Sequence, residues 1–248
     1  TDKLNYNSKS QTILIDNLRL FPSKAIQSKI EFEVILPRVA FQGVDLQSLL
    51  FDNTLKLDQL SVDGSEINLN IIRGFKSSEK KQNKNSKTGN ALPKSIEEIS
   101  IQRIDALNST LAINYEVGEN DIQSIKTNFD LGVTGLFLDS SMTTKENFTG
   151  LFEDISLKLE DFSFALPDSI HNVKFSSLLV NNKAEETVFS DFQVIPNNTS
   201  GYPGVPILKA NVAELGIKHN SLRQIESTGV FDILQLRLTD PIIELYLD

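Results

Sequence analysis

The feature that most constrains the fold is an alternation of apolar and polar residues that recurs along almost the whole chain. The stretch LKLDQLSVDGSEINLNI at residues 55–71 shows it twice, on either side of the polar sequence Asp63-Gly64-Ser65-Glu66. A period of two places every second side chain on the same face of a β-strand. Because Asp-Gly between two such segments is a typical turn signal, the pattern predicts a β-hairpin at 55–71. The stretch FDILQLRLTDPIIELYL at 231–247 predicts a second one.

About fourteen segments carry this alternation, and Asp, Asn, Gly and Pro separate them. Helical patterns are confined to residues 44–51 and 221–226, where Asp45 and Ser221 are suitable N-caps. Strands without crossover helices favour antiparallel pairing. The chain is therefore predicted to be all-β, with a mainly antiparallel sheet and one or two very short helices. Between Leu159 and Phe162 the alternation changes phase at Glu160-Asp161, which predicts a bulge or strand break that bends the sheet.

Two parts of the chain repeat the same order of features. Pairing Val39 with Leu215 and continuing without a gap to Ile71 and Leu247 matches apolar with apolar at most alternating positions. Upstream, ILIDNLRLFP at 13–22 resembles VFSDFQVIP at 188–196, since in both a strand ends in Pro. Each unit is expected to run strand, Pro turn, strand, short helix, strand, turn, strand over roughly 60 residues.

The repeat suggests a division of the chain into four segments. These are a first β repeat unit at 1–75, a Lys-rich segment at 76–95, a central β segment at 96–186 and a second copy of the repeat unit at 187–248, expected to form one continuous sheet. The Lys-rich segment has almost no apolar residues, so it is expected to be a mobile loop. Contact of its lysines with anionic lipid head groups is the alternative.

Composition excludes several classes of function. A net charge of −9 argues against nucleic acid as a partner, and the absence of Cys excludes disulfides and thiolate metal sites. His171 and His219 are the only side chains that ordinarily titrate near neutral pH, and both are expected in solvated turns. The chain has no HExxH, GxSxG or Gly-rich phosphate loop. We therefore expect no enzyme activity, cofactor or metal.

Three segments carry a resemblance to a known family. VAFQGVDLQSLLFDNTLKLDQLSVDGSEINLNI, its C-terminal copy LGIKHNSLRQIESTGVFDILQLRLTDPIIELYLD and SIEEISIQRIDALNSTLAINYE resemble the AsmA-like family of bacterial envelope proteins. The C-terminal copy departs from the family pattern with His219-Asn220, where the first copy has Gly43-Val44.

The resemblance implies an elongated, curled, groove-like sheet whose concave face is apolar. It also implies a periplasmic segment of a protein that is anchored in the inner membrane by an N-terminal helix outside this sequence. Members of the family are implicated in moving phospholipid between the inner and outer membranes, or in outer-membrane assembly. Phospholipid or a similar amphipathic lipid, and envelope proteins, are therefore the expected partners.

Phenylalanine supplies 15 of the aromatic residues and is concentrated in the middle of the chain. Ordinary core packing and the lining of a lipid groove both explain this concentration. The candidate groove residues are Phe129, Leu131, Leu157, Leu159, Phe162, Phe164, Phe175, Phe192, Leu236 and Leu238.

Two alternatives to lipid binding remain open. One is a scaffold or assembly factor whose sheet edges recruit partner strands. The other is a carbohydrate-active enzyme, which requires two carboxylates about 5 to 10 Å apart in a cleft.

Overall fold

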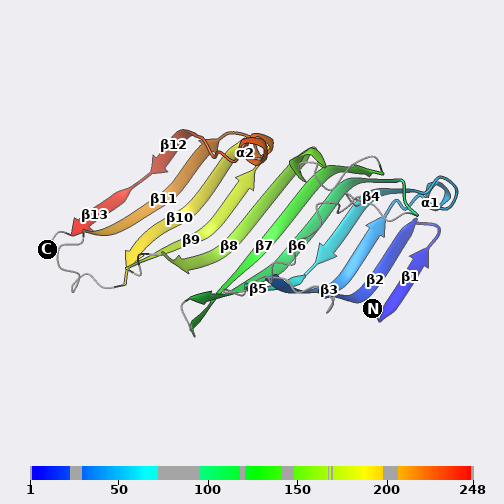
Figure 1. Cartoon of the computed structure of the whole chain (residues 1–248), viewed down its shortest axis with the longest axis horizontal. Coiled ribbons are helices and arrows are strands. Elements are labelled where there is room, and N and C mark those ends of the chain that lie inside the picture. Colours follow the sequence, from blue (N-terminus) through cyan, green and yellow to red (C-terminus); the bar gives the residue numbers. More distant parts are fainter. Residues whose placement is uncertain are drawn as a thin grey trace, which may run out of the picture. The chain divides into compact units, whose positions relative to one another are not determined.

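Figure 1 shows the fold of the chain as a computed structural model. The structure describes residues 2–22, 30–71, 95–117, 121–140, 148–166, 168, 170–197 and 206–246. These residues form a mixed sheet of 13 strands with two short α-helices and one turn of 3-10 helix. The all-β prediction is confirmed. The strand order is β1-β2-β3-β4-β6-β7-β8-β9-β10-β11-β12, while β5 pairs with β3 and β6, and β13 pairs with β11.

The chain divides into two compact units. The first comprises Thr1–Ser124 and Asp130–Ile155, and the second comprises Ile125–Phe129 and Ser156–Asp248. The first unit contains β1 (Lys3–Asn7), β2 (Thr12–Leu20), β3 (Ile30–Gln42), α1 (Leu46–Phe51), β4 (Thr54–Asp63), β5 (Glu66–Ile71), β6 (Glu98–Val117), most of β7 (Asp121–Asp139) and the 3-10 turn η1 (Phe148–Gly150). The second contains most of β8 (Asp154–Ala165), then β9 (His171–Asn181), β10 (Glu186–Pro196), β11 (Ile207–His219), α2 (Leu222–Thr228), β12 (Ile233–Thr239) and β13 (Ile242–Tyr246).

Residues 55–71, which the sequence predicts to be a hairpin, instead form two strands, β4 and β5, that continue in the same direction with a kink between them. β3 pairs antiparallel with both β4 and β5, through pairs such as Val39↔Val62 and Val34↔Ile67. Since both pairings are antiparallel to the same strand, β4 and β5 run in the same direction one after the other. The hairpin prediction is therefore wrong.

The backbone at the kink explains why the chain does not reverse. Gly64 adopts a positive φ of 69°, and its N–H donates to the carbonyl of Leu107 on β6 (2.9 Å). The carbonyl of Ser65 accepts from Thr110 N–H, also on β6 (2.7 Å). Both residues stay bonded to the neighbouring strand, so the Asp-Gly signal marks a break within a ladder and not a turn.

β6 is the exception to antiparallel pairing among the described ladders. It pairs in parallel with β4 and β5, and its 20 residues join segments that alternation had suggested were two strands. A parallel neighbour requires a crossover connection. That connection includes residues 72–94, so the Lys-rich segment, apart from Ser95, lies outside the described residues.

The internal repeat is present in the ladder itself. Shifting β3–β4–β5 by 176 residues (39 to 215) converts Val39↔Val62 into Leu215↔Leu238, which is a pair of β11 and β12. The same shift converts pairs of β3 and β5 into pairs of β11 and β13. β12 and β13 therefore also follow one another along β11, and the second predicted hairpin is wrong for the same reason.

The two short helices begin where the sequence predicts. Asp45 accepts a hydrogen bond from the N–H of Ser48 (3.0 Å) at the start of α1, and Ser221 accepts from Gln224 N–H (3.2 Å) at the start of α2. Both N-caps are confirmed. Gly229, at a φ of 68°, ends α2 in the left-handed conformation that glycine adopts without steric cost.

Within each unit, kinks in several strands lie at the same level of the ladder. In the first unit they are at Asn17, Gly64 and Asn108. In the second they are at Asp161, Asp191 and Asp240. All six residues have positive φ, which Gly, Asn and Asp tolerate best. The predicted bulge or strand break at Glu160-Asp161 is not found, because β8 runs through these residues without a break or a register shift. The change of phase instead coincides with the positive φ of Asp161, which is one of a line of such residues across the second unit.

Candidate functional site

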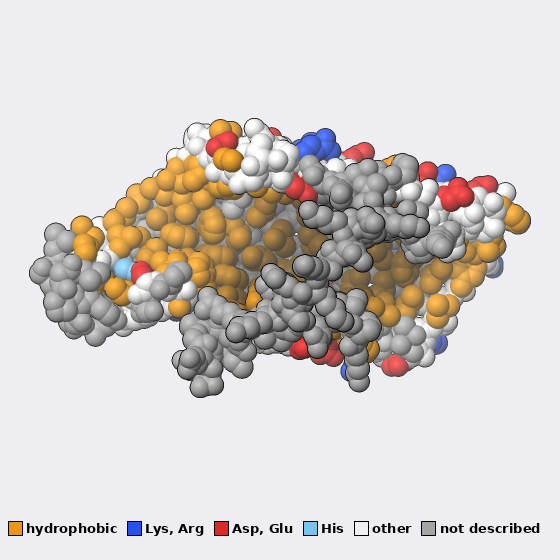
Figure 2. Space-filling model, viewed as in Figure 1, with side chains coloured by type: hydrophobic (Ala, Val, Ile, Leu, Met, Phe, Trp, Pro, Cys, Tyr) orange, Lys and Arg blue, Asp and Glu red, His pale blue; other side chains and the backbone are white. Residues whose placement is uncertain are grey.

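One face of the second unit is built from apolar rows that cross successive strands. Because facing residues in a ladder share a face, the register defines these rows directly. The rows are Leu157, Val180, Thr187, Ile217 and Leu236; then Leu159, Leu178, Phe189, Leu215 and Leu238; then Phe162 with Phe175 and Phe192 with Val212 beside the kink; then Phe164, Val173, Val194, Ala210 and Ile243. Figure 2 shows hydrophobic side chains across this part of the sheet.

A chain of phenylalanine rings holds the middle of this face together. Phe162 stacks on Phe175 with ring centroids 5.1 Å apart, and Phe175 meets Phe189 edge-on at 5.3 Å. Phe164 and Phe192 contact the two ends of this chain, each at 5.6 Å. Such pairs contribute about 0.5–1.5 kcal/mol each beyond area burial. The cluster stiffens the floor of the apolar face across β8, β9 and β10.

Eight of the ten candidate groove residues lie on this face of the second unit, at the positions given by the rows. They differ in burial: Phe175 is 5% exposed, while Leu236 and Leu238 on the edge strand are 55% and 42% exposed. Phe129 is buried at 8% on the part of β7 that belongs to the second unit, and Leu131 is half-buried in the first unit.

On β9, sequence reasoning identified Phe175 but missed the rest of the strand. Val173, Leu178 and Val180 lie in the rows, but the alternation changes phase between Phe175 and Leu178 and so does not read as one strand. The predicted run Val188-Ser190-Phe192-Val194 changes face for the same kind of reason, at the kink at Asp191.

The first unit also has an apolar face, with rows such as Ile13, Phe41, Leu60 and Ile104. Its best buried cluster is Val44, Leu57 and Ile101, which are 1%, 3% and 6% exposed. Val44 lies in the turn before α1 and packs over the ends of β4 and β6.

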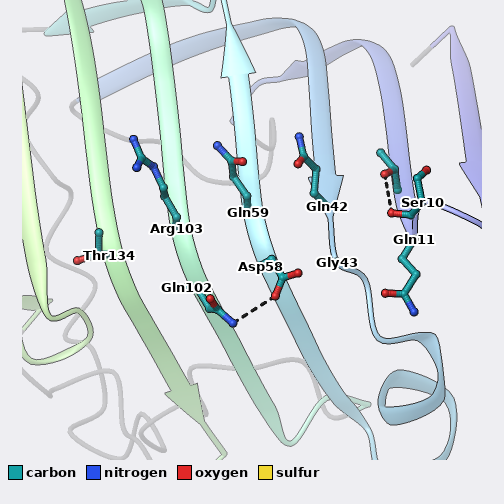
Figure 3. Close-up of a pocket in the computed structure, with 10 residues that line it drawn as sticks. Ser10, Gln11, Gln42, Gly43, Asp58, Gln59, Gln102, Arg103 and Thr134 are labelled. Atoms are coloured by element: carbon teal, nitrogen blue, oxygen red, sulfur yellow. Dashed lines mark hydrogen bonds between the residues drawn. The ribbon is translucent and has the colours of Figure 1, made fainter.

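The opposite face of the first unit carries a polar pocket of about 600 Å³, shown in Figure 3. Its lining residues are Ser10, Gln11, Thr12, Gln42, Gly43, Asp58, Gln59, Gln102, Arg103 and Thr134. Gln102 Nε2 donates to Asp58 Oδ1 (3.2 Å), and Arg103 Nε donates to the buried carboxylate of Asp105 (2.7 Å). The hydrogen bond from Arg103 holds the pKa of Asp105 below its usual value. Amides and hydroxyls make this a site for hydrogen bonding to a polar group. No sequence pattern distinguished it from a solvated face.

The expectation that both histidines are solvated is wrong. His171 is 8% exposed: Nδ1 donates to Asp168 (2.6 Å), and Nε2 accepts from Leu208 N–H (3.1 Å). His219 is 1% exposed: Nδ1 donates to the Asn220 carbonyl (2.7 Å), and Nε2 faces the Thr187 hydroxyl (3.0 Å). Both nitrogens of each ring are therefore engaged in contacts within the protein. They tie together strands and turns.

The contact between His171 and Asp168 also affects the pKa of Asp168. The hydrogen bond from His171 lowers the pKa of Asp168 from 3.8 to about 2. Among the described residues there is no group of three or more His, Asp or Glu side chains that would hold a metal ion.

No family model matches the chain, and no curated protein matches its sequence. None of the helices in the described ranges combines the length and hydropathy that a membrane crossing requires.

Proposed function

We propose that the chain binds phospholipid or a similar amphipathic lipid, with the acyl chains along the apolar face, and passes it on without covalent chemistry. The observation that carries this proposal is the set of apolar rows across β8 to β12. In the described part of the chain, all strands belong to one sheet, so these rows meet no second sheet.

Physical chemistry favours an apolar occupant for such a face. An alternating sheet normally covers its apolar side with another layer. Removal of apolar surface from water is worth about 25 cal/mol per Å², or about 0.8 kcal/mol for each CH₂ of an acyl chain. Acyl chains are flexible, so they can follow the bends at the kinked residues. The charged head group then stays in water beyond the apolar rows, and movement along the face needs no bond to be made or broken.

The resemblance to the AsmA-like family supports the same proposal and suggests a setting for it. In that setting the chain is a periplasmic segment of a protein anchored in the inner membrane through a helix outside this sequence. Its role would be passage of lipid between the inner and outer membranes.

A scaffold or assembly factor for envelope proteins is the second candidate. The observation that favours it is the exposed strand β12, where Ile233 and Leu234 are 59% and 67% exposed. An apolar strand at a sheet edge is a surface to which another strand can add.

Native mass spectrometry with lipid extraction, on protein purified gently from a bacterial host, tests the lipid proposal. The test variant is Phe164→Asp, which places a charge in an apolar row. The matched control is Ser163→Asp, an exposed position one residue earlier on the other face of β8. We expect wild type and Ser163→Asp to carry phospholipid and Phe164→Asp to lose it while keeping its circular dichroism spectrum. A lipid-free mass for folded wild-type protein, or equal loss in both variants, would contradict the proposal.

A further inference from the structure

The edge formed by β12 and β13 lacks a neighbour that its counterpart in the first unit has. In the first unit, β4 and β5 lie between β3 and β6. In the described part of the second unit, β12 and β13 pair with β11 alone (Figure 1). The burial of equivalent residues differs accordingly: Leu57 is 3% exposed, and its counterpart Ile233 is 59% exposed.

The repeat fixes what kind of strand fits this edge. The register of β12 and β13 on β11 is that of β4 and β5 on β3 at a constant offset of 176 residues (39 to 215), including the break between the two strands. Gly64 and its counterpart Asp240 both have positive φ. The free edge of β12–β13 therefore follows the same backbone path as the edge of β4–β5 that pairs with β6. On β4–β5, that pairing is parallel.

Polar side chains at the edge match this partner. In the first unit, Gln59 Nε2 donates to the carboxylate of Asp105 on β6 (2.7 Å). The counterpart of Gln59 is also glutamine, Gln235, and it is exposed. The next residue on the same face, Arg237, already pairs with Glu214 (3.0 Å) and Glu186 (3.5 Å) of its own sheet. The exposed amide of Gln235 is therefore the group that suits a strand with a carboxylate at the place of Asp105.

Proline at the break does not remove the contacts that a partner would use. Pro241 is the counterpart of Ser65, and prolines on edge strands often block pairing because they lack an N–H. Ser65 contributes its carbonyl to Thr110 N–H on β6 (2.7 Å) and its hydroxyl to Ser109 (2.6 Å). Proline keeps the carbonyl, so the edge loses the hydroxyl contact but not this backbone bond.

We propose that the β12–β13 edge binds a β-strand of a partner polypeptide that adds in parallel, in the register that β6 has on β4–β5. The partner strand has apolar residues at alternate positions and a carboxylate that accepts from the amide of Gln235, as Asp105 accepts from Gln59. This interaction goes beyond lipid binding and does not depend on it, although the added strand would extend the apolar rows.

The probe is a labelled peptide with the sequence of β6, residues Glu98–Val117, added to the full chain. The chain has no Cys, so single cysteines report position without background. By the repeat, Gln235 takes the place of Gln59 opposite Arg103, and Thr239 takes the place of Asp63 opposite Leu107. Facing residues of neighbouring strands lie within the Cα separation that a disulfide spans, about 4.4–6.8 Å.

We expect Gln235→Cys to cross-link with the Arg103→Cys peptide, and Thr239→Cys with the Leu107→Cys peptide, under mild oxidation. A peptide with Leu107→Pro should bind about tenfold more weakly or worse in fluorescence anisotropy. The main chain of Leu107 faces the β4–β5 side, where its carbonyl accepts from Gly64 N–H, and proline removes the N–H of the same residue.

The reversed pattern, Gln235→Cys with Leu107→Cys and Thr239→Cys with Arg103→Cys, would show antiparallel addition and overturn the proposal. So would the absence of both binding and cross-links. If sedimentation shows that the chain dimerises and the peptide competes with the dimer, the occupant is a second copy, and the proposal is also wrong. None of these results depends on whether lipid co-purifies.

Discussion

Replacing Leu57 by alanine should destabilise the first unit far more than the same change at Leu50. Leu57 on β4 is 3% exposed and packs against Val44 and Ile101. Leu50, on α1, is 71% exposed. Both changes remove the same atoms from the same unit, so burial is the largest difference between them.

The structure sets the size of the difference. Truncation of a fully buried leucine costs about 2–5 kcal/mol in free energy of unfolding, through lost burial and the cavity left behind. Half-buried neighbours such as Leu55 and Leu60 can relax toward the cavity, so we expect about 2–3 kcal/mol for Leu57→Ala. For Leu50→Ala we expect a change within about 0.5 kcal/mol, because the side chain is already in water.

Urea unfolding followed by circular dichroism measures this difference. With a slope of about 2 kcal/mol per molar urea, Leu57→Ala should lower the midpoint by about 1–1.5 M, while Leu50→Ala should stay near wild type. Equal midpoints for the two variants would refute the assignment of Leu57 to the buried cluster.

Two further predictions concern a glycine and an acid. Gly43→Ala should cost about 1–3 kcal/mol more than Gly64→Ala. Both residues have positive φ, but a Cβ at Gly43 would lie 2.0 Å from Oδ2 and 2.8 Å from Cβ of Asp58. A Cβ at Gly64 would have no such neighbour within 4 Å. Equal urea midpoints for the two variants would argue against this steric clash at Gly43. Because the folded pKa of Asp168 lies below its unfolded value of 3.8, its contribution to stability is present above about pH 4 and is lost as the pH falls toward 2. Asp168→Asn should therefore lose less stability than wild type between about pH 6 and pH 2.5, and parallel pH profiles would contradict the His171 contact.

Much of the fold could be predicted because alternation and capping are local signals. The period of two identified most strands, and Asp45 and Ser221 marked both helix starts. The gapless match of Val39 with Leu215 anticipated the structural repeat, since residues that face the same neighbours tend to keep the same character.

The wrong predictions arise where one local sequence pattern is compatible with two different structures. Asp63-Gly64 favours both a reversal and a kink, and only the pairing with β6 decides between them. The change of phase between Phe175 and Leu178 hid β9, and the kink at Asp191 placed Val188 on the wrong face. Tertiary contacts that no sequence pattern shows also bury His219. The polar pocket around Asp58 is undetectable for the same reason: its residues come from separate strands and resemble an ordinary solvated face.

Quenching of a single tryptophan by brominated phospholipid tests the central claim most directly. The chain has no Trp, so Phe164→Trp reports from the apolar face and Ser163→Trp from the opposite face of the same strand. Lipid along the apolar rows predicts strong quenching at position 164 and little at position 163. Equal quenching at both positions, or none at position 164 in protein that carries the lipid, would contradict it.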